Sequence, residues 1–394
     1  MAVAQKMTQF MTRASWIRKM FEEGARLKAI HGAENVFDFS LGNPNVAPPQ
    51  SLQARLEALV RTPPQGLHAY MPNAGLPRVR QALADYLTRE HQVPFQLNHV
   101  VLTCGAAGAL NVVMKALLDP GDEVLVPTPH FVEYGFYADN HGGLLRTART
   151  REDFQLDLDA IGANIGLKTK IVLINSPNNP TGQIYDPASL DKLGEILAAG
   201  SERVGHAIYL VADEPYRKIV YDGATVPSLF QSYRNSIVVT SYSKDLSIPG
   251  ERIGYAAVHP DADDGSQLLD AMTLANRILG FVNAPALMQW LIKDLLDECI
   301  DTEIYKRKRD RLVDALRAAG YQCGSPPGAF YLFPRAPIED DVSFVRLLQE
   351  EKILVVPGSG FGGPGHFRIA YCVDDATIEG ALPGFRRAMG KVRT

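Results

Sequence analysis

Cysteine is scarce in this sequence, and so is tryptophan: the 394 residues include 4 cysteines and 2 tryptophans. The cysteines are far apart along the chain and form no Cys-x-x-Cys pair, so their spacing indicates neither a zinc site nor a disulfide framework. Reduced thiols are usual in the cytosol, and we therefore expect a cytoplasmic protein without a metal centre.

A strong charge bias is also absent. The formal net charge is -4 at pH 7, which gives no electrostatic reason to expect nucleic acid or an anionic membrane as a partner. No apolar run approaches the roughly 20 residues that a membrane-spanning helix needs. Hydrophobic residues make up 46% of the chain and charged residues 21%, as in an ordinary globular protein.

The first 21 residues carry several basic side chains and no acid before Glu22. An organellar transit peptide has this character. The run from Ser15 to Leu27, however, has apolar residues near helical spacing. We interpret the segment as an amphipathic helix of the folded protein and keep the transit peptide as the alternative.

Short apolar or β-branched runs alternate with helical segments through the middle of the chain. Continuous apolar strands of this kind indicate a mostly parallel sheet that is covered by helices on both faces. The runs expected to be strands are Val100–Thr103, Glu123–Val126, Lys170–Asn175, Ala207–Ala212 and Ser236–Thr240. A helix pattern over Ala106–Leu118 follows the first of them.

Polar residues directly follow four of these strands. In an open α/β sheet the ligand crevice lies beyond the carboxyl ends of the strands. The four clusters are Gly105–Ala107, Asn178–Gly182, Asp213 and Ser241–Lys244. The sequence therefore predicts one site at this edge of the sheet.

The chain changes character after about residue 290. The segments expected there are a long charged helix at roughly Leu291–Ala319, then Gly328–Phe333, a helix near Val342–Glu351, and Phe367–Cys372. This pattern predicts a smaller α+β domain, and 394 residues exceed what one hydrophobic core usually serves. We expect residues 46–285 to form a large domain, and residues 1–45 to form a small domain together with residues 286–394.

A lysine that could form a covalent bond lies just past a predicted strand, in the segment Ser241-Tyr242-Ser243-Lys244. Arg252 and Gly254 follow it. A lysine amine forms an imine with a carbonyl compound, whereas serine hydroxyls and an arginine fork bind phosphate oxygens. The group suits a cofactor that carries both a carbonyl and a phosphate. A surface lysine in a turn is the alternative for the short motif alone, and the full spacing argues against it.

This stretch resembles the cofactor-lysine signature of the class I/II aminotransferases of pyridoxal-phosphate (PLP) fold type I, which are aspartate aminotransferase-like. The resemblance covers about residues 15 to 390. It implies an α/β large domain, with a mostly parallel sheet of the seven-stranded type flanked by helices, and a smaller α+β domain. It also implies that pyridoxal 5'-phosphate is bound to Lys244 and that Ser241, Ser243 and Arg252 hold its phosphate.

Other motifs match the same family in the same order. The segment Asn178–Gly182 looks like its Asn-Pro-Thr-Gly turn, in which the asparagine, here Asn179, bonds the ring oxygen beside the substrate. Asp213 would pair with the pyridine nitrogen, and Tyr216 would share the ring oxygen with Asn179. A plain Asn-Pro turn and a helix cap by Asp213 are the structural alternatives.

Three further matches concern the cofactor. Gly105, Ala106 and Ala107 open a predicted helix, where free N–H groups and the helix dipole favour phosphate. Phe131 resembles the aromatic residue that stacks on the ring, although tyrosine is commoner there, and an ordinary core aromatic is the alternative. Tyr70 resembles the tyrosine that reaches the phosphate of the partner subunit.

The remaining matches concern the substrate. Arg368 looks like the arginine that binds the substrate carboxylate by two parallel bonds, and a surface arginine on an edge strand is the alternative. Gly42 resembles a glycine whose backbone contacts the same carboxylate. A dicarboxylic substrate would need a second cation, for which Arg277 is the candidate and a solvated helix arginine the alternative.

The resemblance implies a homodimeric aminotransferase with shared active sites. Such an enzyme moves an amino group between an L-amino acid and a 2-oxo acid, with glutamate and 2-oxoglutarate as one pair and aspartate as a candidate donor. Lys244 would be the general base. A β-eliminating C–S lyase is the main alternative, followed by a decarboxylating or ring-forming synthase of this fold. A ligand sensor in a transcription regulator would need a DNA-binding module, for which we find no spare segment.

Overall fold

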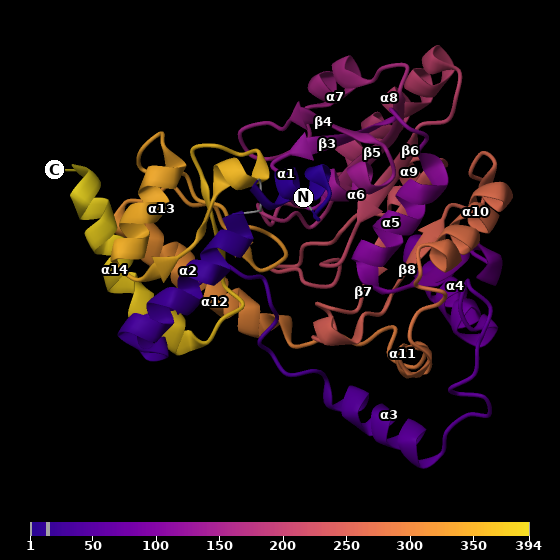
Figure 1. Cartoon of the computed structure of the whole chain (residues 1–394), viewed down its shortest axis with the longest axis horizontal. Coiled ribbons are helices and arrows are strands. Elements are labelled where there is room, and N and C mark those ends of the chain that lie inside the picture. Colours follow the sequence, from indigo (N-terminus) through magenta and orange to yellow (C-terminus); the bar gives the residue numbers. More distant parts are fainter. Residues whose placement is uncertain (1, 13–15, 394) are drawn as a thin grey trace.

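The structure, a computed structural model, describes residues 2–12 and 16–393. Two units lie side by side, a larger one that is built on a central sheet and a smaller one that is formed near both ends of the chain (Figure 1). Ser15, where the first predicted helix begins, lies outside the described residues. Helix α2 (Trp16–His31) covers the rest of that prediction.

The larger unit contains a seven-stranded sheet with the order β2-β8-β7-β6-β5-β3-β4. Its strands are β2 (Val100–Thr103), β3 (Glu123–Thr128), β4 (Leu144–Arg149), β5 (Thr169–Asn175), β6 (Tyr209–Asp213), β7 (Ser236–Ser241) and β8 (Gly254–Val258). β8 runs antiparallel to both of its neighbours, and every other adjacent pair in this sheet is parallel. The prediction of a mostly parallel α/β sheet is confirmed.

Two strands of this sheet carry no clear signal in the sequence. β4 is the edge strand next to β3, and most of its residues are exposed or half-buried, so it lacks a continuous apolar run. β8 has the sequence Gly-Tyr-Ala-Ala-Val, in which glycine and alanine do not favour a strand. Both strands form because their neighbours in the sheet hold them.

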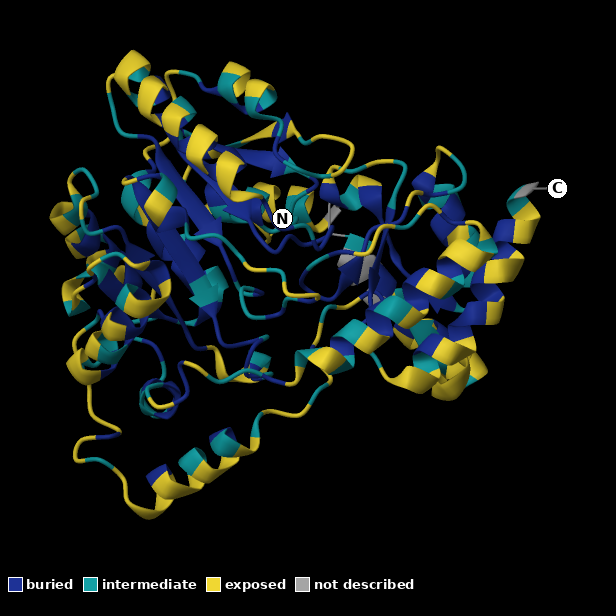
Figure 2. Cartoon of the chain, turned by 180° about the vertical axis from the view of Figure 1, so that it is seen from behind, coloured by how far each residue is buried: buried dark blue, intermediate teal, exposed yellow. Residues whose placement is uncertain are grey.

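Helices cover both faces of the sheet. Ile171 and Leu173 of β5 pack into one hydrophobic cluster and Val172 and Ile174 into the other, as alternation along a strand requires. Figure 2 shows the buried strands between more exposed helices. The helices of this unit are α3 (Gln50–Arg61), α4 (Pro77–His91), α5 (Gly105–Leu117), α6 (Tyr134–Asn140), α7 (Leu158–Asn164), α8 (Pro187–Val204), α9 (Leu229–Ser232), α10 (Gly265–Ile278) and α11 (Ala286–Ile292).

The smaller unit packs helices against two short sheets around an aromatic-rich cluster. β1 pairs in parallel with β10, and the second sheet has the order β11-β12-β9. The strands are β1 (Phe37–Asp38), β9 (Tyr331–Leu332), β10 (Ile353–Leu354), β11 (Val356–Pro357) and β12 (Phe367–Ala370), and the helices after residue 300 are α12 (Thr302–Ala319), α13 (Asp341–Glu350) and α14 (Asp375–Arg393). Both ends of the chain thus contribute to one core.

The prediction of one helix from Leu291 to Ala319 is wrong. α11 ends at Ile292, and α12 begins at Thr302. The chain breaks between them because Asp301 caps α12 by accepting the backbone N–H of Glu303 at 3.0 Å, which leaves the preceding residues outside the helix.

Two segments pack away from the unit in which we expected them. α1 (Gln5–Thr12) lies against α6, with Lys6 Nζ 2.6 Å from Asp139 Oδ2. Leu295 and Leu296 belong to a hydrophobic cluster of the larger unit. This packing favours a larger unit that extends beyond residue 285. Within residues 2–12 and 16–393, no helix is both long and apolar enough to cross a membrane.

Candidate active site

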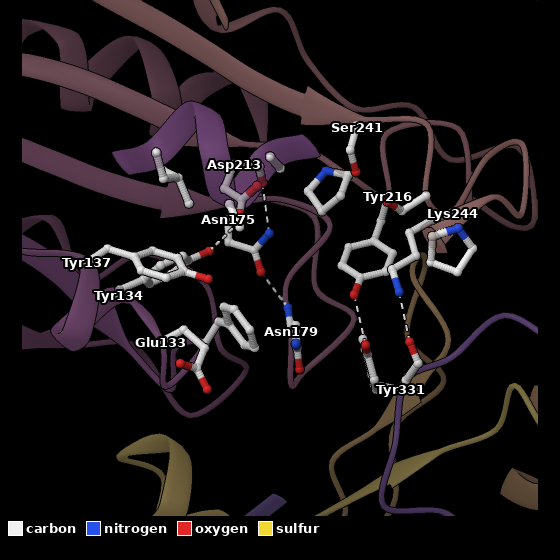
Figure 3. Close-up of a pocket in the computed structure, with 18 of the residues that line it drawn as sticks. Glu133, Tyr134, Tyr137, Asn175, Asn179, Asp213, Tyr216, Ser241, Lys244 and Tyr331 are labelled. Atoms are coloured by element: carbon white, nitrogen blue, oxygen red, sulfur yellow. Dashed lines mark hydrogen bonds between the residues drawn. The ribbon is translucent and has the colours of Figure 1, made fainter. Parts of the chain in front are cut away.

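A cavity of about 340 Å³ opens at the carboxyl ends of three neighbouring strands (Figure 3). Asn175, Asp213 and Ser241 are the last residues of β5, β6 and β7, and all three line it. The predicted site residues on its walls are Gly42, Ala106, Ala107, Phe131, Asn179, Asp213, Tyr216, Ser241, Ser243, Lys244, Arg252 and Arg368. Residues from both units therefore meet at the edge of the sheet where the sequence predicts a site.

Asp213 presents one unpartnered oxygen. Tyr134 Oη donates to Asp213 Oδ2 at 2.7 Å, whereas Oδ1 is buried and has no hydrogen-bond partner among the described residues. Burial raises the pKa of the Asp213 carboxyl to about 7, and the bond from Tyr134 acts in the opposite direction. Because an unpaired buried polar atom is costly, Oδ1 suits an N–H or cationic group that binds in the cavity.

Asn175 joins the end of β6 to the Asn-Pro turn. Its Nδ2 donates to the backbone oxygen of Asp213 at 2.7 Å, and its Oδ1 accepts the backbone N–H of Asn179 at 2.6 Å. Within the turn, Asn178 Oδ1 accepts the N–H and the hydroxyl of Thr181 at 3.1 and 2.9 Å. Asn175 and Asn178 hold the turn, so that the side chain of Asn179 lines the cavity, where its Oδ1 accepts a hydrogen bond from Arg368 Nη1.

Lys244 extends into the cavity from the turn after β7. Its Nζ donates to the carbonyl of Gly42 at 2.8 Å and lies 6.0 Å from the ring centre of Tyr216. Burial lowers the pKa of the Lys244 ammonium to about 8. A part of the amine is therefore neutral slightly above pH 7, the form that acts as a nucleophile or a base.

A tight contact on the same wall requires glycine at position 42. Tyr216 Oη and Tyr331 Oη are 2.8 Å apart, and a Cβ at Gly42 would lie 2.0 Å from Tyr331 Oη. The backbone at Gly42 can thus approach both the tyrosine pair and the Lys244 amine.

Arg368 is buried without a carboxylate among its hydrogen-bond partners. It is 1% exposed, and its guanidinium carbon lies 4.8 and 4.7 Å from the ring centres of Tyr331 and Phe361. Nη1 donates to Asn179 Oδ1 at 3.0 Å and Nη2 to the backbone oxygen of Ser40 at 2.5 Å, while Nε has no partner among the described residues. The surface alternative is therefore wrong, and this cation suits a bound anion.

A phosphate-sized anion would find donors at the start of α5. The N-cap residue Cys104 makes no side-chain cap, so the first N–H groups of the helix keep their affinity for an anion. Gly105 has a φ of 73°, and a Cβ there would lie 2.8 Å from Arg252 Nη2. Only glycine therefore lets Arg252 approach this helix end. The hydroxyl residues Ser241 and Ser243 line the same cavity.

The donor set fits pyridoxal phosphate on three separate counts. The unpartnered Oδ1 of Asp213 fits a protonated ring nitrogen. The N-terminus of α5 and Arg252 fit the phosphate. The neutral form of the Lys244 amine suits attack on a carbonyl carbon.

Sequence reasoning missed several residues of this cavity. Asn175 was detectable, because it is a polar residue at the end of a predicted apolar strand. Tyr134 stands three residues after Phe131, and no local pattern shows that its hydroxyl reaches Asp213. Tyr331 likewise depends on contacts across the two units. The other missed wall residues are Leu41, Leu110, Glu133, Tyr137, Pro215 and Pro249.

Three predicted residues do not line the cavity, and of these Gly105 lies next to it, at the start of α5. Tyr70 is 95% exposed and is not part of the cavity wall. Arg277 is exposed in the last turn of α10, also away from the wall. In this structure, neither Tyr70 nor Arg277 contributes to the site of its own chain.

Comparison with known proteins places these features in a family. Residues 34–384 match the family described as aminotransferase class I and II. The chain is 31% identical over 373 residues to a probable aspartate/prephenate aminotransferase of Aquifex aeolicus, a match that covers 91% of this chain and 92% of that protein. It is 30% identical over 389 residues to an aspartate aminotransferase of Bacillus subtilis, covering 93% of this chain and 95% of that protein.

Solved structures agree with this comparison. An aminotransferase from Eubacterium rectale superposes with a TM-score of 0.96 at 40% identity, over 100% of both chains. The aspartate aminotransferase of Thermus thermophilus, solved with maleate, superposes with a TM-score of 0.86 at 26% identity, over 98% of this chain and 100% of that one.

Removing the Asp213 carboxyl is expected to change how stability depends on pH. The pKa of about 7 in the fold lies above the ordinary 3.8, so between these values the unfolded chain ionises while the folded protein stays protonated. Stability therefore falls as pH rises through this window, by at most about 1.4 kcal/mol per pH unit.

Asparagine does not titrate, so the cofactor-free Asp213→Asn variant should gain stability relative to the unsubstituted protein between pH 4.5 and 7. Urea unfolding at several pH values measures the difference. A difference that stays constant with pH would contradict the shifted carboxyl.

Proposed function

Since this chain belongs to the class I and II aminotransferase family, we propose that it holds pyridoxal phosphate on Lys244 and transfers an amino group from an L-amino acid to a 2-oxo acid. The enzyme class is that of the family: the chain is an aminotransferase. The observation that carries the assignment of its residues is their convergence on one cavity. A half-buried amine, a carboxylate oxygen without a partner among the described residues and a buried arginine face the same space.

Each residue has a definite task in this proposal. Bound pyridoxal phosphate supplies a carbonyl carbon that exchanges amino groups and a ring that accepts electrons when the substrate loses its α-proton. Lys244 Nζ takes that proton and returns it, as its lowered pKa allows. Asp213 would keep the ring nitrogen protonated through Oδ1. Arg368 binds the substrate α-carboxylate.

The hydroxyl and amide groups of the site orient these reacting groups. Tyr134 fixes the Asp213 carboxylate through Oδ2. Asn179 and Tyr216 offer an amide and a phenol to the ring oxygen, and the amide of Asn179 also holds Arg368. The Phe131 ring forms part of the wall and supports a flat cofactor by stacking.

The substrate pair is a narrower proposal. Two relatives are named for aspartate, and one solved relative carries the dicarboxylate maleate, which supports aspartate or glutamate with a 2-oxo acid such as 2-oxoglutarate. The names of these relatives do not favour the β-eliminating lyase. That alternative would release pyruvate and ammonia from cysteine-like substrates without a 2-oxo acid acceptor.

Replacing Lys244 is expected to separate cofactor attachment from cofactor binding. The Lys244→Ala variant should lose turnover by at least about 10³-fold, because no amine remains to move the proton. It should still bind pyridoxal phosphate, since Arg252 and the helix end are intact.

The measurement is turnover together with borohydride reduction and mass analysis of the protein. Reduction should leave the cofactor attached to Lys244 in the unsubstituted enzyme and no attached cofactor in the variant. Full turnover by the variant would disprove the assignment.

Replacing Arg368 should weaken the binding of all amino acid substrates alike. Arg368→Ala removes the group that binds the α-carboxylate, which every donor carries, so kcat/KM should fall by about 10²-fold or more for aspartate, alanine and phenylalanine in turn. Half-reactions followed through the cofactor spectrum measure each donor. Loss for the dicarboxylic donor alone would instead assign Arg368 to the distal carboxylate.

We propose a homodimer that shares its sites. The exposed Tyr70, and the exposed apolar side chains Leu274 and Ile278 of α10, support a surface that a second copy covers. Sedimentation of the holoenzyme should give twice the 43.2 kDa mass of the chain, and Tyr70→Phe should weaken cofactor binding without dissociating the dimer. A fully active monomer would contradict the proposal.

A further inference from the structure

A second group of charges, buried or half-buried, lies directly behind the active-site wall. Pro215 and Ser241 line both the cavity and a small void of about 30 Å³ among the described residues. The charged residues around this void are Glu214, Arg217, Lys218 and Asp245. Glu214 and Asp245 directly follow Asp213 and Lys244 in the sequence, so the charges sit on the two turns that carry the reacting groups.

Lys218 joins these two turns to a third segment. Its Nζ lies 4.0 Å from Asp245 Oδ2 and donates to the backbone carbonyl of Leu296 and, at 3.1 Å, to that of Glu298. The ring centre of Tyr86 is 5.4 Å away. Arg217 binds elsewhere, to Glu214 and to the loop that follows the same turn. Lys218 is thus the cation of this group that reaches residues 296–298.

The segment held by Lys218 is the point where the chain passes from one unit to the other. Leu296 belongs to a hydrophobic cluster of the larger unit, whereas Ile300 belongs to that of the smaller unit. The N–H of Ile300 donates to the backbone oxygen of Asp245 at 2.7 Å. Residues 296–300 are the second passage of the chain between the units, here called the second crossing; the first is at residues 42–46. The second crossing is therefore bonded to the residue next to Lys244.

The first crossing of the chain reaches the same turn. Lys244 Nζ bonds Gly42, and Ser247 Oγ donates to the backbone oxygen of Val46 at 2.5 Å. Both crossings between the units are thus hydrogen-bonded to residues 244–247. A loosened crossing would move the turn that positions the Lys244 amine.

We infer that Lys218 is a positioning residue, whose ammonium group ties the second crossing to the turn of Lys244. The inference concerns the proposed catalytic amine, but its contacts exist without cofactor or substrate. The Lys218 side chain is half-buried, and its ammonium binds two carbonyls and faces the Asp245 carboxylate. Its removal leaves both carbonyls without this donor and the carboxylate without its nearby cation, while Asp245 Oδ1 keeps the N–H of Leu246. Its loss therefore loosens residues 244–247 and 296–300 together.

The test compares Lys218→Met, Lys218→Arg and a control, Lys192→Met, in the cofactor-free protein. Lys192 is 60% exposed and pairs with Glu195 on the outer helix α8. Hydrogen–deuterium exchange should become about tenfold faster at residues 244–248 and 296–301 in Lys218→Met, while β5 and β6 stay protected. Lys218→Arg should largely restore protection, because it keeps the charge and the donors, and the control should match the unsubstituted protein.

A second measurement follows the Lys244 amine itself through its pH-dependent reaction with an amine-labelling reagent. Burial holds the pKa of this ammonium at about 8, so a loosened turn should shift it upward, by roughly 0.5 to 1 pH unit in Lys218→Met. In the holoenzyme, kcat should fall about tenfold with KM changed less than about threefold.

The outcomes separate this inference from the proposed function. Unchanged exchange at residues 244–248 together with an unchanged Lys244 titration would overturn the positioning role, whatever the enzyme catalyses. Faster exchange throughout the sheet would also overturn it, because it would mark general destabilisation. A failure of Lys244→Ala to lose turnover would remove the proposed base but leave these cofactor-free results intact.

Discussion

Asn175 and Asp213 stand opposite one another at the ends of two neighbouring parallel strands, and the amide of Asn175 bridges them at 2.7 Å. Side chains alternate along a strand, so a slip of one residue would turn the Asp213 carboxylate to the other face of the sheet. The backbone pairing of β5 with β6 from Ile171↔Tyr209 to Asn175↔Asp213, together with the Asn175 amide bond, holds this register. The position of the carboxylate thus follows from the pairing of these two strands.

The site keeps charged groups in the interior without fully satisfying them. Asp213 Oδ1 and Arg368 Nε are buried and lack partners in the described chain, and Lys244 has a pKa lowered by burial. Such groups cost stability, whereas a ligand that pairs with them returns stability through binding. A fold that holds them open therefore favours its cofactor and substrate over the empty state.

The sequence predicts most of what lies along single strands and turns. Asp213, Ser241 and Lys244 were found because they directly follow apolar runs, where ligands bind in such sheets. The resemblance added the role of Arg368, whose place on β12 shows no local sign of a site. Tyr134 stayed hidden because its role depends on a contact over 79 residues of sequence.

The predicted helix from Leu291 to Ala319 failed for a similar reason. The charged helical pattern does not show the break, which is held by the Asp301 cap and by long-range bonds such as that from Ile300 to Asp245. Tertiary contacts of this kind override local propensity.

The core of the smaller unit combines the two ends of the chain, so it cannot be completed until synthesis is almost finished. β1 pairs with β10, and Phe37 stands opposite Ile353, 316 positions later (353 − 37). At the roughly 5–20 residues per second of translation, the first strand waits about 15–60 s for its partner. During that interval the early apolar face, with Met20 and Phe39, stays uncovered beside a sheet that can already fold. The nascent chain thus passes through a stage at which chaperones have a defined segment to protect.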